Sequence, residues 1–228
     1  MREIVMDTET TGLEANGGDR IVEIGGVELI NHLPTGKTYH QYINPERSMP
    51  QEAFDVHGLG DEFLRDKPVF AEIADAFLAF VGDAKLVIHN ASFDMGFLNA
   101  ELRRLGKPPL PANQATDTLE IARRKFPGAQ ASLDALCRRF GVDNSNRTLH
   151  GALLDSEILA EVYLELLGGR QQGMALDTRQ SSSGAEAVAT DWVPPARPRP
   201  LASRLTEEEA AAHAAFVAEL GDGALWKT

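Results

Sequence analysis

The order of apolar runs along the chain constrains its fold more than any other feature of the sequence. Three β-rich runs come first, at residues 2–7, 20–30 and 37–43, close enough together to pair as an antiparallel meander. Beyond residue 50, runs with helical spacing alternate with one short buried strand at 85–89. Strands followed by interleaved helices predict an α/β domain with a mixed central sheet flanked by helices. The longer helices are expected at residues 70–81, 92–105, 119–126, 132–140 and 151–167.

The composition of the chain changes after Leu167. Residues 169–204 are rich in Gly, Ser, Pro and Gln without a sustained period, which predicts a flexible linker. Thr206 and Glu209 then form a capping-box pattern, so we expect a short C-terminal helix that ends near Leu220. A helix of this length is unstable alone in water, which indicates a partner. The predicted organisation is a domain at 1–168, a linker at 169–204 and a tail at 205–228.

The charge balance limits how the chain can bind its partners. Its 228 residues carry 22 basic and 34 acidic side chains, a formal net charge of −12. Because neutralised phosphates supply most non-specific affinity for nucleic acid, a chain this acidic needs another way to hold such a substrate. The single cysteine excludes a disulfide framework within the chain. No apolar run approaches the ~20 residues that span a bilayer, and acids interrupt the N-terminus, so we expect a cytoplasmic protein without membrane contact.

Four carboxylates occupy positions where solvated carboxylates are not expected. Asp7 and Glu9 share one face of the first strand, since side chains two apart point the same way. Asp94 and Asp155 each lead the apolar stripe of a helix that has no Lys or Arg one turn away on that face. Any one of them could cap a helix or a turn, but the four together, with His150 beside the last, indicate bound divalent cations with oxygen ligands.

Three segments of the sequence resemble a known family. DTETTG, HNASFD and HGALLDSEIL are similar to the three motifs of DEDDh 3′–5′ exonucleases, in order, over residues 1–168. A histidine five residues before the last aspartate is typical of the histidine-containing branch. The resemblance implies a ribonuclease H-like fold. Within the family, RTLHGALLDSEILAEVYL and the ending ALWKT are most similar to the epsilon (proofreading) subunits of bacterial DNA polymerase III.

The resemblance also implies the chemistry of the site. Asp7, Glu9 and Asp155 would bind the metal that holds the attacking water, and Asp7 with Asp94 would bind a second metal, both Mg²⁺ or Mn²⁺. His150 would be the general base, and 5′-mononucleotides would leave one by one from a DNA 3′ end. Leu13 would act as a wedge under the last base of a frayed primer terminus. The residues expected to contact substrate are Asp7, Glu9, Thr10, Leu13, Glu52, His57, Asn90, Phe93 and Asp155.

The linker and tail resemble segments that bind other replication proteins. In QQGMAL, Gln171, Met174 and Leu176 match a short motif that binds the sliding clamp (beta). The resemblance implies that the tail docks on the DNA polymerase III alpha subunit through Phe216, Val217, Leu220, Leu225 and Trp226. Two alternatives stay open: a free-standing 3′ trimming nuclease acting on RNA or DNA, which would not need the linker and tail, and a non-catalytic adaptor bridging polymerase and clamp, which would not need the clustered acids.

Overall fold

A mixed sheet forms the centre of the fold. The computed structural model describes residues 1–147, 149–169 and 205–220, and these form a sheet of five strands in the order β3-β2-β1-β4-β5. The strands are β1 (Arg2–Thr10), β2 (Ile21–Ile30), β3 (Leu33–Tyr42), β4 (Lys85–Ile88) and β5 (Ala115–Asp117). β1, β2 and β3 pair antiparallel, whereas β4 pairs parallel to β1 and β5 parallel to β4. The mixed sheet predicted from the order of apolar runs is therefore confirmed.

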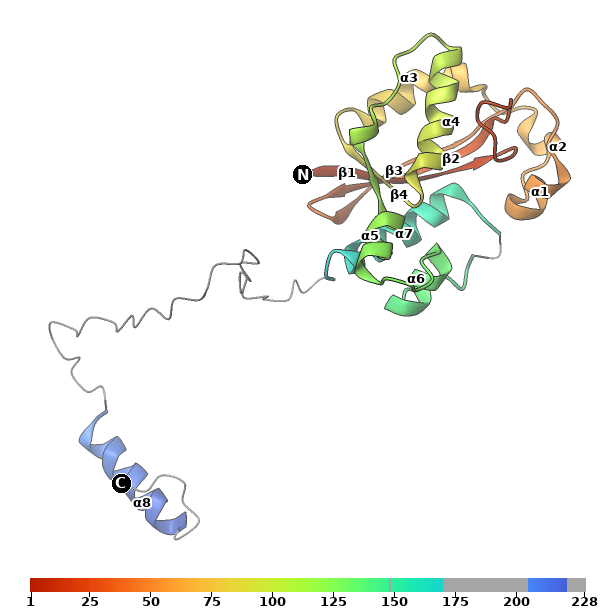
Figure 1. The fold of residues 1–228 in the computed structure, drawn as a ribbon. Coiled ribbons are helices and arrows are strands. Elements are labelled where there is room, and N and C mark those ends of the chain that lie inside the picture. The colour runs from red at the N-terminus through yellow and green to blue at the C-terminus, as the bar shows by residue number, and fades with distance from the viewer. Residues whose placement is uncertain (148, 170–204, 221–228) are drawn as a thin grey trace, which may run out of the picture. The chain divides into compact units, whose positions relative to one another are not determined.

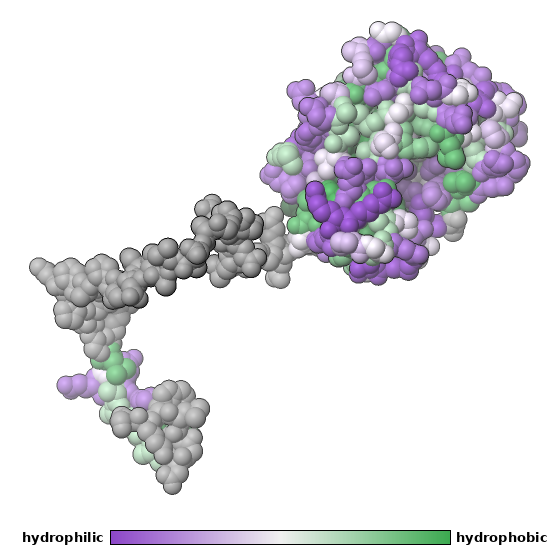
Figure 2. Space-filling model, in the orientation of Figure 1, coloured by the Kyte–Doolittle hydropathy of each residue, from purple (hydrophilic) through white to green (hydrophobic). Residues whose placement is uncertain are grey.

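Helices cover both faces of this sheet (Figure 1). One layer holds α3 (Phe70–Val81) and α4 (Ala91–Arg104). The opposite layer holds α5 (Thr118–Lys125), α6 (Leu133–Phe140) and α7 (Ala152–Leu166). The short helices α1 (Gln51–His57) and α2 (Asp61–Leu64) lie at the end of the sheet toward which β1 runs. The visible surface of residues 1–169 is mostly hydrophilic, with smaller apolar areas between the polar side chains (Figure 2).

Alternation along β1 decides which layer each side chain meets. Ile4 and Met6 are buried in the cluster that contains Phe77 of α3 and Leu98 of α4. Val5 is buried with Leu159 of α7 on the other face. Because successive side chains of a strand point to opposite faces, the odd residues that follow Val5 also face α7. The side chains of Asp7 and Glu9 therefore lie on the face of β1 that is covered by α7.

The structure differs from the sequence prediction at several elements, and β3 begins at Leu33 instead of residue 37. β1 continues to Thr10 instead of ending at Asp7, because its pairing with β2 extends as far as Thr10. β5 and α2 were not predicted, since a strand of three residues and a helix of four carry too few positions to show a period. β5 forms because it pairs with β4, a partner that is distant in sequence.

The helix α8 (Glu207–Leu220) belongs to a second structural unit, separate from the unit that contains the sheet. Its start has the predicted capping box: the Glu209 amide donates to Thr206 Oγ1 at 3.2 Å, and the Thr206 amide donates to Glu209 Oε2 at 2.9 Å. Across the described ranges, no helix is long and apolar enough to cross a membrane.

Candidate active site

The end of β1 opens a gap in the sheet. β1 pairs with β4 only from Glu3 to Val5, and β4 ends at Ile88, where the chain turns into α4. Side chains from both faces of β1 can therefore meet beyond this point. A crevice at the carboxyl ends of parallel strands is the usual ligand position in such sheets.

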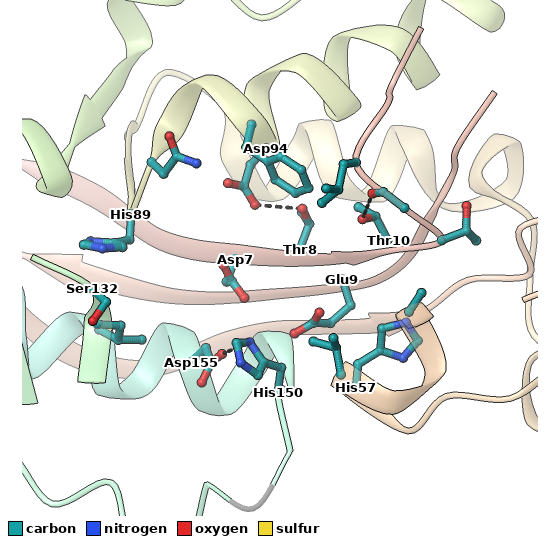
Figure 3. Close-up of a pocket in the computed structure, with 18 of the residues that line it drawn as sticks. Asp7, Thr8, Glu9, Thr10, His57, His89, Asp94, Ser132, His150 and Asp155 are labelled. Carbon is teal, nitrogen blue, oxygen red and sulfur yellow. Dashed lines mark hydrogen bonds and ion pairs between the residues drawn. The ribbon is translucent and has the colours of Figure 1, made fainter. Parts of the chain in front are cut away.

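The four predicted carboxylates converge on this gap. Asp7 and Glu9 project from β1 toward α7, where Asp155 lies in the first turn (Figure 3). Asp94 comes from the first turn of α4 on the other side of β1, and its Oδ1 accepts from Thr8 Oγ1 at 2.7 Å. Asp94 and Asp155 are 2% and 3% exposed. Three segments distant in sequence, β1, α4 and α7, thus bring these four acids to one place.

Burial changes the protonation of these acids. Desolvation, followed by the charges of Asp94, Glu9 and Asp155, raises the pKa of Asp7 well above its ordinary value. Desolvation and the charge of Asp155 raise the pKa of Glu9 to about 8. Desolvation raises the pKa of Asp94 to about 7, although the hydrogen bond from Thr8 opposes this shift. Such carboxylates favour a proton or a cation between them.

The donor set fits a hard divalent cation. Glu9, His150 and Asp155 each offer a ligand atom, and these atoms lie within 4.8 Å of one another. Glu9 Oε1 is buried and has no hydrogen-bond partner among the described residues. A buried carboxylate oxygen without a donor is a ready ligand for Mg²⁺ or Mn²⁺. Asp7 and Asp94 line the same cavity without belonging to this group of three.

His150 lies just before α7 and is more accessible than the acids. Its side chain is 49% exposed, and its Nδ1 lies 3.6 Å from Asp155 Oδ2. Its backbone amide donates to the Val56 carbonyl at 3.1 Å, which ties this connection to α1. Desolvation, followed by the neighbouring Arg147 cation, lowers the pKa of His150, so the imidazole is neutral near pH 7.

The other predicted substrate residues line the same cavity, whose volume is about 810 Å³. Leu13 lies at its edge with 83% of its surface exposed, whereas His57 is buried at the end of α1. Desolvation lowers the pKa of His57, and its Nδ1 accepts from the Leu59 amide at 3.0 Å. The cavity thus combines the predicted metal, base and substrate positions, the last being Thr10, Leu13, Glu52, His57, Asn90 and Phe93.

Comparison with known proteins identifies the family. A family model described as Exonuclease matches residues 4–163. The chain belongs to this exonuclease family. It is 50% identical over 220 residues to the DNA polymerase III subunit epsilon of Rickettsia prowazekii, covering 95% of this chain and 96% of that relative. It is 46% identical over 237 residues to the Escherichia coli (strain K12) subunit epsilon, covering 99% and 97%.

Solved exonuclease structures share the fold. Exonuclease X, in complex with 5′ overhanging duplex DNA, matches 72% of this chain and 90% of its own, at 28% identity and a TM-score of 0.57. The nuclease domain of 3′hExo, a DEDDh family member bound to rAMP, covers 73% of this chain and 91% of its own, at 20% identity and a TM-score of 0.64. The protein is an exonuclease of the epsilon type, with metal-dependent 3′–5′ activity and a ribonuclease H-like fold.

Two cations that line this exonuclease site, Arg147 and Arg123, were not predicted from the sequence. Arg147, from the connection between α6 and α7, donates from Nε to Asp155 Oδ1 at 2.5 Å and from Nη2 to Oδ2 at 2.8 Å. Arg147 precedes the helix that carries Asp155, so the spacing of charges within that helix gives no sign of this pair. Arg123, at the end of α5, also lines the cavity.

Two further acids hold the starts of the helices that carry Asp94 and Asp155. Glu23 of β2 accepts the Ala152 amide of α7 through Oε2 at 3.1 Å. Asp117 of β5 accepts the Ala91 amide of α4 through Oδ2 at 3.1 Å. In the sequence, Glu23 is recognisable only as an acid inside an apolar strand, and nothing local marks its target.

The predicted partner residues belong to the C-terminal part of the chain, beyond α7 in the sequence. Phe216, Val217 and Leu220 are on α8, where Phe216 and Leu220 are exposed. Gln171, Met174, Leu176, Leu225 and Trp226 lie outside the described residues, as does most of the predicted linker. The boundaries 1–168, 169–204 and 205–228 stay a prediction.

Proposed function

We propose that this exonuclease hydrolyses the terminal phosphodiester at a DNA 3′ end and thereby proofreads for a DNA polymerase III. The observation that carries the proposal is the convergence of Asp7, Glu9, Asp94, Asp155 and His150 on one cavity at the end of β1. Relatives named DNA polymerase III subunit epsilon support the replicative role. The cytoplasm is the setting that fits this role.

Asp7, Glu9, Asp94 and Asp155 are the residues that would hold two divalent ions. Bound Mg²⁺ or Mn²⁺ would supply charge stabilisation to the phosphoryl oxygens and acidify a water molecule. The chain itself contributes the placement of the four carboxylates, which are fixed by β1, α4 and α7. Because Asp94 and Asp155 are 2% and 3% exposed, bulk water has little access to these two carboxylates.

His150 would accept the proton of the attacking water. Its lowered pKa keeps the imidazole neutral near pH 7, and its half-exposed position gives it access to a substrate in the cavity. The proton would pass to an imidazole nitrogen while the water oxygen attacks phosphorus and the 3′ oxygen of the penultimate nucleotide leaves.

The remaining residues of the cavity would bind the terminal nucleotide. Glu52 and His57 of α1, with Thr10 and Asn90, would provide polar contacts, and Phe93 would stack on a base. Leu13, exposed at the cavity edge, would separate the last base from its neighbour. A mispaired end costs less to unpair, so this arrangement favours mismatched termini.

Partner proteins would hold this acidic enzyme near its substrate. Its net charge of −12 opposes accumulation on DNA, whereas a tether raises the effective concentration without new DNA contacts. We assign alpha-subunit binding to the tail and clamp binding to Gln171, Met174 and Leu176.

A digestion assay on 5′-labelled single-stranded DNA tests the proposal. We expect Mg²⁺ or Mn²⁺ to support stepwise shortening from the 3′ end and EDTA to stop it. Asp7→Ala should lower the rate of shortening more than about 100-fold, because a carboxylate that would hold the metal is lost. Asp83→Ala, an exposed acid in the turn after α3, is the matched control and should behave as wild type.

The same assay separates the alternatives. Chelator-resistant digestion would contradict the metal assignment. Preference for an RNA strand over a DNA strand of the same sequence would favour the trimming nuclease. Binding to polymerase and clamp without any digestion would favour the adaptor.

A further inference from the structure

A guanidinium lies among the acids of the exonuclease site. Arg147 is 10% exposed at its side chain and lines the same cavity as the proposed metal ligands. Its Nε and Nη2 form a two-pronged contact with both Asp155 oxygens, at 2.5 and 2.8 Å. A planar fork of this kind fixes a carboxylate in direction as well as in position.

Arg147 connects three parts of the chain. Its Nη1 donates to Asp134 Oδ1 of α6 at 2.9 Å, and its Nη2 also lies 3.0 Å from His150 Nδ1 in the connection to α7. Asp134 in turn accepts from Asn144 Nδ2 at 3.0 Å. One side chain therefore ties α6, α7 and the histidine-bearing connection together.

In the described part of the chain, the side-chain hydrogen bonds of Asp155 come from this one partner. Among the described residues, the donors within hydrogen-bond distance of the Asp155 carboxylate are Nε and Nη2 of Arg147. An ionised carboxylate offers about four lone-pair sites. A fork on one side therefore leaves room for a metal on the other.

We propose that Arg147 is a positioning residue of this exonuclease: its fork orients the Asp155 carboxylate and places His150, while Asp134 holds the fork. The proposal rests on the proposed function, which makes Asp155 a metal ligand. Two effects of Arg147 on a divalent cation have opposite signs. Its charge repels the cation, whereas its two-pronged contact orients the Asp155 carboxylate as a ligand, and we expect the second effect to be the larger.

Direct Mn²⁺ binding, measured by the electron paramagnetic resonance signal of free Mn²⁺, distinguishes the two effects. We expect Arg147→Gln to weaken binding by about 10–100-fold, the usual consequence of losing a residue that orients a metal ligand. Arg147→Lys keeps the charge but not the fork, so we expect a loss of the same order. Tighter binding by Arg147→Gln, or unchanged binding by Arg147→Lys, would overturn the proposal.

Arg2→Gln is the matched control. Arg2 also pairs with an acid, Glu28, at 2.7 Å, but at the opposite end of β1. Its loss should change thermal stability without changing Mn²⁺ affinity. A matching loss of Mn²⁺ affinity in Arg2→Gln would show that Arg147 acts through general stability, which contradicts the proposal.

A second pair of variants, at Asp134, tests whether this acid holds the Arg147 guanidinium in place while Arg147 itself stays unchanged. Asp134→Ala should weaken Mn²⁺ binding more than Asp134→Asn, which keeps an accepting oxygen for Nη1. Equal binding by the two variants would contradict the role of Asp134.

The outcomes also separate this proposal from the proposed function. If wild type itself binds no Mn²⁺, the proposed function fails. If wild type binds Mn²⁺ and the Arg147 variants bind it equally well, only the positioning role of Arg147 is overturned. Asp134 is half exposed, so its substitution should not prevent folding. The Asp134 variants therefore remain informative even if Arg147→Gln does not fold.

Discussion

At the scale of single residues, burial decides the chemistry of the carboxylates. Glu9, with a pKa raised to about 8, is surrounded by Asp155, Glu23 and Asp94, and desolvation is the largest cause of its shift. A sequence shows that acids recur at certain positions, but it does not show how much water reaches them. The metal hypothesis could be formed from the spacing of the acids, whereas the pKa shifts required the packed layers.

The raised pKa of Glu9 predicts how stability changes with pH. In EDTA, the native state retains a proton on Glu9 between about pH 4.5 and pH 8, whereas the unfolded chain has lost it. The unfolding free energy should therefore fall as pH rises through this window, by up to about 1.4 kcal/mol per pH unit for one proton. Chemical denaturation at several pH values measures this slope.

Comparison with Glu9→Gln isolates the contribution of this residue. His57 and His150 have lowered pKa values and change stability in the opposite direction, but they are present in both proteins. Wild type should lose stability relative to Glu9→Gln as pH rises, and Mg²⁺ should recover it for wild type. Parallel pH profiles for the two proteins would contradict the shift.

At the scale of elements, acids of the sheet accept hydrogen bonds from the first amides of the two helices that carry Asp94 and Asp155. The N-cap residues are Asn90 for α4 and Gly151 for α7. Within the described residues, neither of them caps its helix with a side-chain hydrogen bond. Asp117 and Glu23 accept the first amides instead. An added Cβ at Gly25 would lie 2.2 Å from the Ala152 carbonyl carbon, so glycine permits this close approach of α7 to β2.

Replacing Glu23 tests this way of positioning α7. Glu23→Ala should lower the unfolding free energy by about 1 kcal/mol, as for a lost cap, and should lower kcat more than it raises KM, because His150 and Asp155 flank Ala152. Glu23→Gln keeps an accepting oxygen and should restore most of kcat. Steady-state digestion of a labelled strand measures both constants, and equal kcat for the two variants would refute the positioning.

At the scale of the whole molecule, catalysis and retention on DNA are assigned to different parts of the chain. The cavity lies within the sheet domain, whereas Phe216 and Leu220 are exposed apolar side chains one turn apart on α8. Residues four apart share a helix face, which suits docking on another protein. With a net charge of −12 opposing accumulation on DNA, such docking would keep the enzyme at a primer end.

Substitutions on α8 separate these two tasks. Phe216→Ala combined with Leu220→Ala should abolish co-purification with the polymerase alpha subunit and leave digestion of free single-stranded DNA at the wild-type rate. Ala214→Gln, on the other face of the same helix, is the control and should keep both properties. Retained co-purification of the double variant would mean that this face of α8 does not dock on alpha.

The sequence by itself determined the longer strands and helices, the acids and His150 as a set, and the family resemblance, because periodicity and motif spacing are local properties of the chain. Only the tertiary structure decided the short strand β5, the contact of Arg147 with Asp155 and the holding of α7 by Glu23. These features depend on partners from 8 to 129 residues away. Local patterns carry no information about which distant residue contacts a given side chain, since that is determined by how the two helical layers pack on the sheet.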